Sequence, residues 1–273
     1  MKRNNINVAG FDIQRTGNNF NQLFTTKEVS KEDSLELLNF EVKFSEAKQI
    51  LSNRRSHYDS IKTSIQNLIF DYEQLKMRFD ADYNETKSNK LINRTLCNRI
   101  HFLKYMLDWQ KTKDWNARWK ARDSAMADNV SWLITNFFPN EKVIIIAHNF
   151  HIAKYNKKEE VMGEFLKSTY GDDIYSLGVF ASIGSYSNNS EKQNVYQCRD
   201  LTRLDIKHII NSLAGNVNFL DIPKSKTKLN TWLFNDIIVN DTFINLSGDN
   251  EMILSKHFDG LLLLDTISVP NKI

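Results

Sequence analysis

Apolar side chains recur every three or four residues over much of the first half of the chain, and this spacing constrains the fold more than any other feature. It runs through three sets of residues: Leu37, Phe40, Phe44, Ala47 and Leu51; Ile61, Ile65, Leu68, Tyr72, Leu75 and Phe79; and Ile92, Leu96, Ile100, Leu103 and Leu107. Such spacing places an apolar stripe along an α-helix. Breaks near residues 52–56 and 80–89 favour antiparallel packing over a coiled coil. We therefore expect a helical hairpin or small bundle over about residues 30–112.

The second half of the chain alternates between helical and strand-like segments. Helices are expected over 115–137, 159–170 and 200–213, and strands over 142–147, 174–182, 218–222 and 258–266, with a further short strand at 7–14. Strands separated by helices predict an α/β fold with a mostly parallel central sheet flanked by helices. We expect residues 143–147, an isoleucine-rich run, to form a buried central strand between the strands at 8–13 and 261–264. The whole chain, 1–273, is expected to be one α/β domain with a helical insertion at about 30–112.

Composition excludes several classes of protein. The 36 basic and 33 acidic residues leave a net charge of only +3, which argues against a dedicated nucleic-acid binder. Cys97 and Cys198 are too few for a disulfide scaffold or a four-cysteine zinc site. No apolar run approaches the ~20 residues of a membrane helix, and the first residues lack the apolar core of a signal peptide. We expect a cytoplasmic protein without membrane or nucleic-acid partners, and the sequence leaves its oligomeric state open.

Two histidines follow the apolar run directly, His148 and His151. In open α/β sheets, ligands bind beyond the carboxyl ends of the strands, so this position favours a site. The two imidazoles could be metal ligands, acid–base groups or donors that polarise a carbonyl. They could equally be one core histidine and one exposed histidine. A catalytic zinc needs about three protein ligands, and no third ligand lies nearby in the sequence, so we expect neither a metal nor a cofactor.

Two polar residues interrupt an apolar helical face just upstream. Arg122 and Asn129 share that face with Met126 and Leu133, at spacings of four, seven and eleven. A guanidinium on a buried face requires an anionic or carbonyl partner. The structural explanation is an ion pair with an acidic neighbour such as Asp123 or Asp128. Three tryptophans, Trp109, Trp115 and Trp119, are expected to pack the helical segment together.

These residues resemble a known family. The pattern Arg-Asp-x-x-Met-x-x-Asn from Arg122 to Asn129, followed by a strand ending in Ala-His-Asn-x-His-Ile from Ala147 to Ile152, closely resembles the erythromycin esterases. Further matches follow the family's order along essentially the whole chain. They are Gly-Phe-Asp from Gly10, Tyr-Ser-Leu-Gly from Tyr175 with Gly-Ser-Tyr from Gly184, and Asp-Gly-Leu-Leu-Leu-Leu-Asp from Asp259 with Pro270.

The resemblance implies a bacterial hydrolase of ester bonds, notably the macrolactone of erythromycin-type antibiotics, and so antibiotic resistance. It implies that His148, His151 and Arg122 are catalytic and line the cleft, and that Asn149, Asn129 and Asp123 contact a small, macrolide-like ester. In such a site a base activates water, while Arg122 and one of the two histidines stabilise the oxyanion. Asn149 fits the role of orienting its loop.

One family motif has no counterpart in the sequence. The family carries its general base in Gly-Glu-x-x-His-Gly ahead of the Gly-Phe-Asp segment, and no Glu-x-x-His occurs in this chain. We therefore expect an N-terminally shortened family member with impaired activity. The alternatives are a catalytically inactive binding or assembly protein that uses the helical arm, and a metal-dependent hydrolase that uses the two histidines.

Overall fold

The structure, a computed structural model, describes residues 7–14, 29–81, 86–187, 195–197, 206–240 and 249–269. Cys198, Pro270 and the first residues of the expected helix at 200–213 lie outside these ranges. The chain divides into two compact units, Met1–Val143 and Ile144–Ile273. We name them the helical unit and the sheet unit, and each is described by itself. Whether they form one domain stays a prediction.

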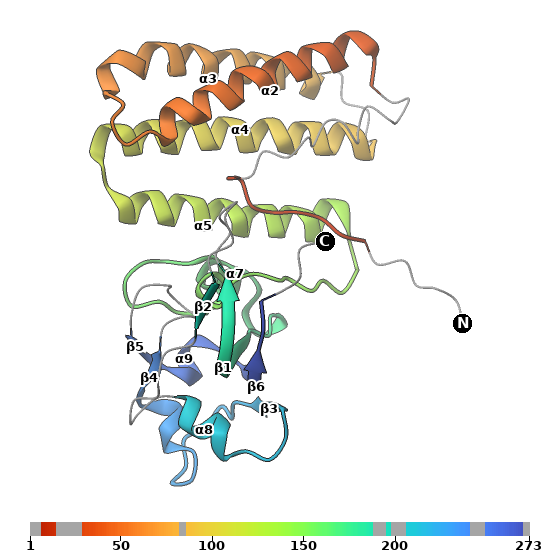
Figure 1. Cartoon of the computed structure of the whole chain (residues 1–273). Coiled ribbons are helices and arrows are strands. Elements are labelled where there is room, and N and C mark those ends of the chain that lie inside the picture. Colours follow the sequence, from red (N-terminus) through yellow and green to blue (C-terminus); the bar gives the residue numbers. More distant parts are fainter. Residues whose placement is uncertain are drawn as a thin grey trace. The chain divides into compact units, whose positions relative to one another are not determined.

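The helical unit confirms the expected helices between residues 30 and 112 and shows three of them (Figure 1). They are α2 (Lys31–Ser52), α3 (Tyr58–Ala81) and α4 (Lys87–Thr112), followed by α5 (Trp115–Trp132) and the π-helical turn η1 (Leu133–Phe137). The side chains of Ser30, Thr86 and Asp114 accept hydrogen bonds from backbone N–H groups in the first turns of α2, α4 and α5. These side chains are helix N-caps, and they explain why α2, α4 and α5 begin where they do.

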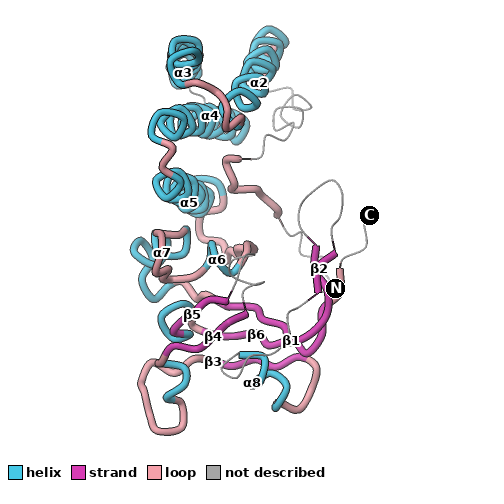
Figure 2. Tube along the Cα trace, turned by 60° about the vertical axis from the view of Figure 1, so that its left-hand side comes forward, coloured by secondary structure: helices cyan, strands magenta, loops and turns pink. Residues whose placement is uncertain are grey.

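The core of the helical unit lies along α4, which is placed between the α2–α3 pair and α5 (Figures 1 and 2). Phe44, Tyr72 and Leu96, one from each of α2, α3 and α4, have no exposed surface. Arg99 on α4 is also buried, and its Nε and Nη2 atoms each lie 2.8 Å from a carboxylate oxygen of Glu41 on α2. Such two-point pairing satisfies a guanidinium that burial would otherwise leave unsolvated.

The sheet unit contains the remaining elements. In chain order these are α6 (Asn149–Ile152), α7 (Met162–Tyr170), η2 (Gly171–Asp173), β1 (Leu177–Ser187), β2 (Val195–Gln197), α8 (Ile206–Ser212), β3 (Val217–Asp221), η3 (Thr231–Phe234), β4 (Asp236–Asn240), β5 (Asp249–Ile253), α9 (Leu254–His257) and β6 (Gly260–Ile267). The expected strands at 174–182, 218–222 and 258–266 correspond to β1, β3 and β6. The antiparallel pair β4–β5 was not expected from the sequence.

The fold is α/β, but the described sheet is small and mixed in strand direction instead of mostly parallel. Its order is β2-β1-β6-β3. β6 runs parallel to β1 and antiparallel to β3, and β2 pairs antiparallel with the end of β1. Both edges of β6 are therefore occupied from Gly260 to Leu264.

The prediction of a central strand at 143–147 is wrong. Residues 141–148 have no regular secondary structure, and Ile144 and Ile146 are 88% and 85% exposed. Residues 143–147 cannot pair with residues 261–264 as expected, because those residues belong to β6 and both edges of β6 are already paired, with β1 and with β3. The expected strand at 7–14 is wrong as well, since that segment is irregular and Val8 is 91% exposed. A short apolar run does not determine a strand without a free edge to pair with.

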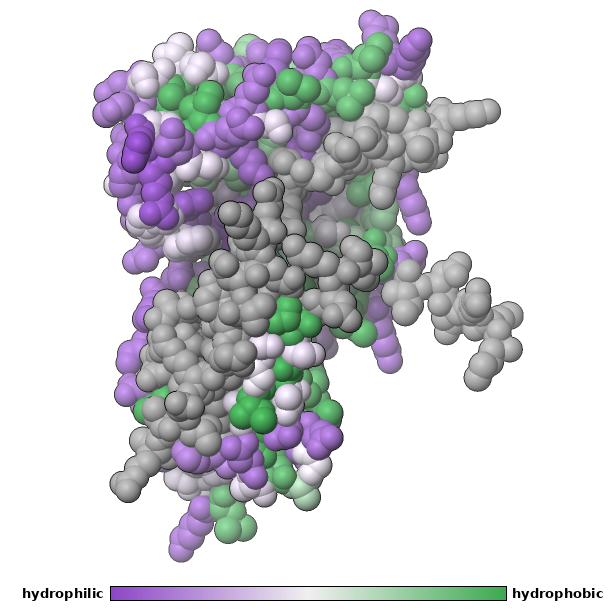
Figure 3. All heavy atoms as spheres, in the orientation of Figure 1, coloured by the Kyte–Doolittle hydropathy of each residue, from purple (hydrophilic) through white to green (hydrophobic). Residues whose placement is uncertain are grey.

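The two faces of the β1–β6–β3 sheet differ. Phe180 and Leu263 are buried on one face with Ile206 and Ile210 of α8. The register aligns Val179, Leu262 and Phe219 on the other face, where Phe219 is 61% exposed. Figure 3 shows hydrophobic residues gathered in the region of β1 and β6. Among the helices of the described ranges, none is both long and apolar enough to cross a membrane.

Candidate active site

His148 caps the short helix α6, and the cap defines its chemistry. Its backbone is extended, and its ring Nδ1 accepts a hydrogen bond of 3.2 Å from the backbone N–H of Phe150. In a neutral imidazole, one nitrogen accepts and the other carries the hydrogen. With Nδ1 accepting, the hydrogen lies on Nε2. In this geometry the exposed ring of His148 is a hydrogen-bond donor at Nε2, which suits it to polarise a carbonyl.

Asn149 fastens α6 to β1. Its side chain is 6% exposed; Nδ2 donates to the carbonyl oxygen of Val179 at 2.7 Å, and Oδ1 accepts from the N–H of the same residue at 3.0 Å. One amide thus satisfies both backbone groups of a strand residue, as a neighbouring strand would. This arrangement agrees with a role in orienting the loop that carries the histidines.

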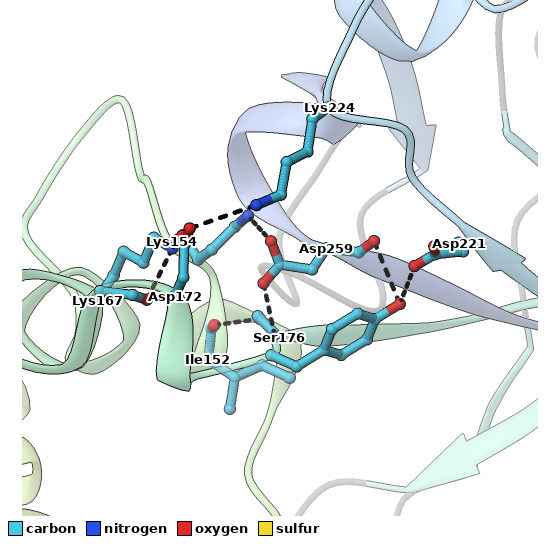
Figure 4. Close-up of polar contacts among 10 residues, drawn as sticks. Ile152, Lys154, Lys167, Asp172, Ser176, Asp221, Lys224 and Asp259 are labelled. Carbon is cyan, nitrogen blue, oxygen red and sulfur yellow. Dashed lines mark hydrogen bonds and ion pairs between the residues drawn. The ribbon is translucent and has the colours of Figure 1, made fainter.

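A second anchor holds the carboxyl end of α6 (Figure 4). Ser176 Oγ donates to the carbonyl oxygen of Ile152 at 2.7 Å, and the Ser176 N–H donates to Asp259 Oδ2 at 2.9 Å. The ammonium group of Lys154 pairs with the other oxygen of Asp259. Both ends of α6 are therefore attached to the β1–β6 region, so the peptide that carries the histidines is held in place.

Tyr175 directly precedes Ser176 of this anchor in the chain. Its hydroxyl donates to Asp221 Oδ1 at 2.6 Å. Burial raises the pKa of Tyr175 to about 12, and the hydrogen bond to Asp221 acts in the same direction. The phenol is therefore neutral at physiological pH and serves as a hydrogen-bond donor that ties the segment before β1 to the end of β3.

His151 is partly buried on α6, and its backbone N–H donates to the carbonyl of His148 at 2.9 Å. Its ring meets that of Phe150 edge-to-face, with centroids 5.2 Å apart. An aromatic neighbour restricts the orientation of the ring. Because Nδ1 of His148 serves the helix cap, His151 is the candidate of the two for proton transfer.

Arg122 forms an ion pair in the helical unit, with a partner that sequence analysis missed. Its Nη2 lies 2.7 Å from Asp12 Oδ2, and its Nε lies 3.3 Å from Asp12 Oδ1. The expected structural partners were Asp123 and Asp128. Asp123 is 1% exposed on α5, while Asp128 pairs with Arg94 at 2.9 Å. The Gly-Phe-Asp segment was the signal that could have identified Asp12.

Asn129 also holds the N-terminal segment, at Phe11, the residue before Asp12. Its Nδ2 donates to the carbonyl oxygen of Phe11 at 2.8 Å, and its Oδ1 accepts from Arg94 Nε at 2.5 Å. Arg122 and Asn129 lie two turns apart on α5, and together they fix residues 11 and 12 along that helix (Figure 1). The spacing of seven in the Arg-Asp-x-x-Met-x-x-Asn pattern therefore has a structural use.

The six candidate residues fall into two groups. Arg122, Asp123 and Asn129 lie on α5 of the helical unit, and His148, Asn149 and His151 lie on or beside α6 of the sheet unit. The members of each group share one helix or its cap. That Arg122 and the two histidines meet in one cleft stays a prediction. Within the described ranges, no three His, Cys, Asp or Glu side chains form a group that could hold a metal ion.

The family model described as erythromycin esterase matches residues 1–267. The putative hydrolase YbfO of Bacillus subtilis is 24% identical over 292 residues, covering 96% of this chain and 64% of YbfO. An Escherichia coli erythromycin esterase type II is 40% identical over 70 residues, covering 23% of this chain and 17% of that protein.

Solved structures agree on the fold. A Bacillus cereus protein has a TM-score of 0.76 at 18% identity, over 97% of this chain and 67% of its own. A mutant of the erythromycin esterase EreC in its open conformation has a TM-score of 0.58 at 16% identity, over 94% of this chain and 66% of its own. The chain therefore spans about two-thirds of the length of these proteins. Because the family model covers nearly all of its residues, the chain belongs to the erythromycin esterase family.

Proposed function

We propose that this chain contributes the carbonyl-polarising part of an ester-hydrolase site whose substrate is a small, macrolide-like ester. The observation that carries the proposal is the helix cap at His148, because a neutral ring that accepts at Nδ1 carries its hydrogen on Nε2, where it is a donor. Family membership supports hydrolysis. Asp12 fixes the plane of the Arg122 guanidinium, which we assign as the second group that stabilises the oxyanion.

The reaction follows the usual course of water-mediated ester cleavage. A base removes a proton from water, the hydroxide oxygen bonds to the ester carbon, and the carbonyl electrons move onto oxygen. His148 Nε2–H and Arg122 stabilise that oxyanion. When the carbonyl reforms, the bond to the alkoxide breaks and the alkoxide takes up a proton. Asn149 keeps α6 attached to β1, and Asn129 holds the carbonyl of Phe11 to α5 beside Arg122.

The identity of the general base determines the rate at which this chain would hydrolyse an ester. The family motif Glu-x-x-His is absent from the sequence, and His151 is the base candidate beside His148. General-base assistance contributes ~10²–10⁴-fold, so we propose that the chain alone is slow by a factor of this order. A catalytically inactive binding protein is the competing function, and a metal-dependent hydrolase is the weaker one.

The proposal is tested by steady-state hydrolysis of erythromycin. His148→Asn is the informative variant, because an asparagine can still cap α6 but lacks the imidazole Nε2–H. We expect a loss of about 10²–10³ in kcat, the usual cost of removing one oxyanion donor. His151→Ala is expected to abolish any pH dependence that arises from a histidine base.

Control measurements separate the alternatives. His208→Ala, an exposed residue on α8, is expected to leave the rate unchanged. Loss of activity on treatment with a chelator would instead support the metal-dependent reading. Saturable binding of erythromycin without hydrolysis, equal in the wild type and in His148→Asn, would support the inactive binding protein and refute the proposed function.

A further inference from the structure

A cluster of tryptophan rings and cationic side chains lies where α4 meets α5, within the helical unit. Arg118 is at its centre: its guanidinium carbon lies 4.6, 4.9 and 5.3 Å from the ring centroids of Trp109, Trp115 and Trp119. Stacking on three rings holds the guanidinium in one orientation and limits its entropy. Packing of the helices explains the rings, but it does not explain why a cation lies among them.

More positive charge surrounds the same rings. The guanidinium carbon of Arg54, from the α2–α3 loop, lies 4.9 Å from the Trp115 centroid, and Lys113 Nζ lies 5.0 Å from the Trp109 centroid. No ion pair joins Arg54, Lys113 or Arg118 to a carboxylate of the described residues. The one carboxylate between Lys113 and Arg118 in sequence, Asp114, caps α5. Three cations and one carboxylate leave a local charge of 3 − 1 = +2.

Two buried donors in the cluster lack acceptors. Trp109 is 2% exposed, and neither its Nε1–H nor the Nε–H of Arg118 has a hydrogen-bond partner in the part of the chain that the structure describes. Indole and guanidinium nitrogens can only donate. Buried polar groups are nearly always paired, so two neighbouring donors without an acceptor point to a ligand oxygen.

The charge environment of Arg118 is consistent with a missing anion. Burial is the main cause that lowers the pKa of Arg118, and the guanidinium groups of Arg54 and Arg122 act in the same direction. Arg122 is neutralised by Asp12, whereas no carboxylate contributes to the pKa shift of Arg118. Like charges are held together here without a counterion from the described residues.

We propose that this cluster binds a phosphate group, as the free ion or as a monoester, through Arg118, Arg54 and the indole N–H of Trp109. A phosphate carries about −1.5 to −2 charges at neutral pH, which matches the local charge of +2 better than a carboxylate does. Its oxygens accept from the fork of a guanidinium in a two-point arrangement. Trp115 is 36% exposed, so this side of the cluster is open to a ligand from solvent.

The test uses the full chain and isothermal titration calorimetry with inorganic phosphate, at constant ionic strength set by chloride. We expect saturable one-to-one binding, with a change in tryptophan fluorescence because three tryptophan rings surround Arg118. Arg54→Gln and Arg118→Gln are each expected to weaken binding by about tenfold or more. The matched control is Arg55→Gln, because this exposed neighbour of Arg54 is of the same type and contacts none of the three rings.

A further variant and a second ligand make the binding test decisive. Arg118→Lys retains the charge but lacks the Nε–H, and we expect it to bind phosphate more weakly than the wild type even if Arg118→Gln fails to fold. Glycerol 2-phosphate distinguishes a monoester ligand, which binds as well as or better than phosphate, from the free ion. Equal binding of acetate and phosphate, or phosphate binding unchanged by Arg54→Gln and Arg118→Lys, would overturn the proposal.

Discussion

The side-chain amide of Asn149 pairs with both backbone polar groups of Val179, donating at 2.7 Å and accepting at 3.0 Å. Replacing it with alanine leaves a strand N–H and carbonyl without partners. We expect Asn149→Ala to lower the free energy of unfolding by about 1–3 kcal/mol. Urea titration measures this loss. Asn235→Ala, at an exposed position in the same unit, is the control and should change stability by less than ~0.5 kcal/mol.

Asp12 and Arg122 lie 110 residues apart and should be coupled energetically. Both side chains are mostly buried, with exposed fractions of 28% and 15%. A double-mutant cycle with Asp12→Asn and Arg122→Gln is expected to give a coupling energy of about 0.5–3 kcal/mol in urea unfolding. Purely additive effects of the two substitutions would show that the ion pair does not hold the N-terminal segment to α5.

The helical half of the fold could be predicted from the sequence because its information is local. Spacings of three and four determine which face of a helix is buried, and Leu37, Tyr72 and Leu96 are buried as that rule requires. Strand pairing is not local. The run at 143–147 has the composition of a buried strand, but the edges of β6 that it would need are filled by β1 and β3.

The candidate site shows the same difference between local and long-range sequence signals. His148 and His151 were noticeable because they follow an apolar run. Asp12 is distant from Arg122 in sequence, so no helical spacing could identify it. The anchor formed by Ser176 and Asp259 was missed for the same reason, since its members are 83 residues apart. Contacts that depend on the assembled sheet carry no local sequence signal.

Gly163 on α7 lies against the peptide that ends α6. A Cβ atom at this position would lie 2.3 Å from the carbonyl oxygen of Ala153 and 2.5 Å from that of Ile152. Because the clashing atoms are backbone, Gly163→Ala should cost about 1–3 kcal/mol and disturb α6. Thermal unfolding provides the measurement. Gly10→Ala is the matched control, since no atom lies within 4 Å of a Cβ there.

His257 should make the stability of the sheet unit depend on pH. Its ring is 7% exposed, Nδ1 lies 2.8 Å from the carbonyl oxygen of Ile253, and burial lowers its pKa below the usual 6.5. The charges that face it are Lys256, Asp236 and Lys154. The unfolded chain therefore takes up a proton at a higher pH than the folded chain does.

The direction of the pH dependence follows from this difference in pKa between the folded and the unfolded chain. The stabilisation is present above about pH 6.5 and is lost as the pH falls toward the lower pKa of the folded state. We expect the melting temperature to fall between pH 7 and pH 5, and this dependence to be weaker in His257→Gln. His208→Gln, at an exposed imidazole on α8, should retain the wild-type pH dependence.

The position of β6 between β1 and β3 determines when the sheet can form during synthesis. β1 ends at residue 187 and β3 at residue 221, yet both pair with a strand that spans residues 260–267. A growing chain therefore carries β3 and most of β1 without their common partner strand until β6 has left the ribosome. The helices before residue 133 form from nearby contacts and need not wait. For the interval between these events, β1 and β3 are the segments that a chaperone has to shield.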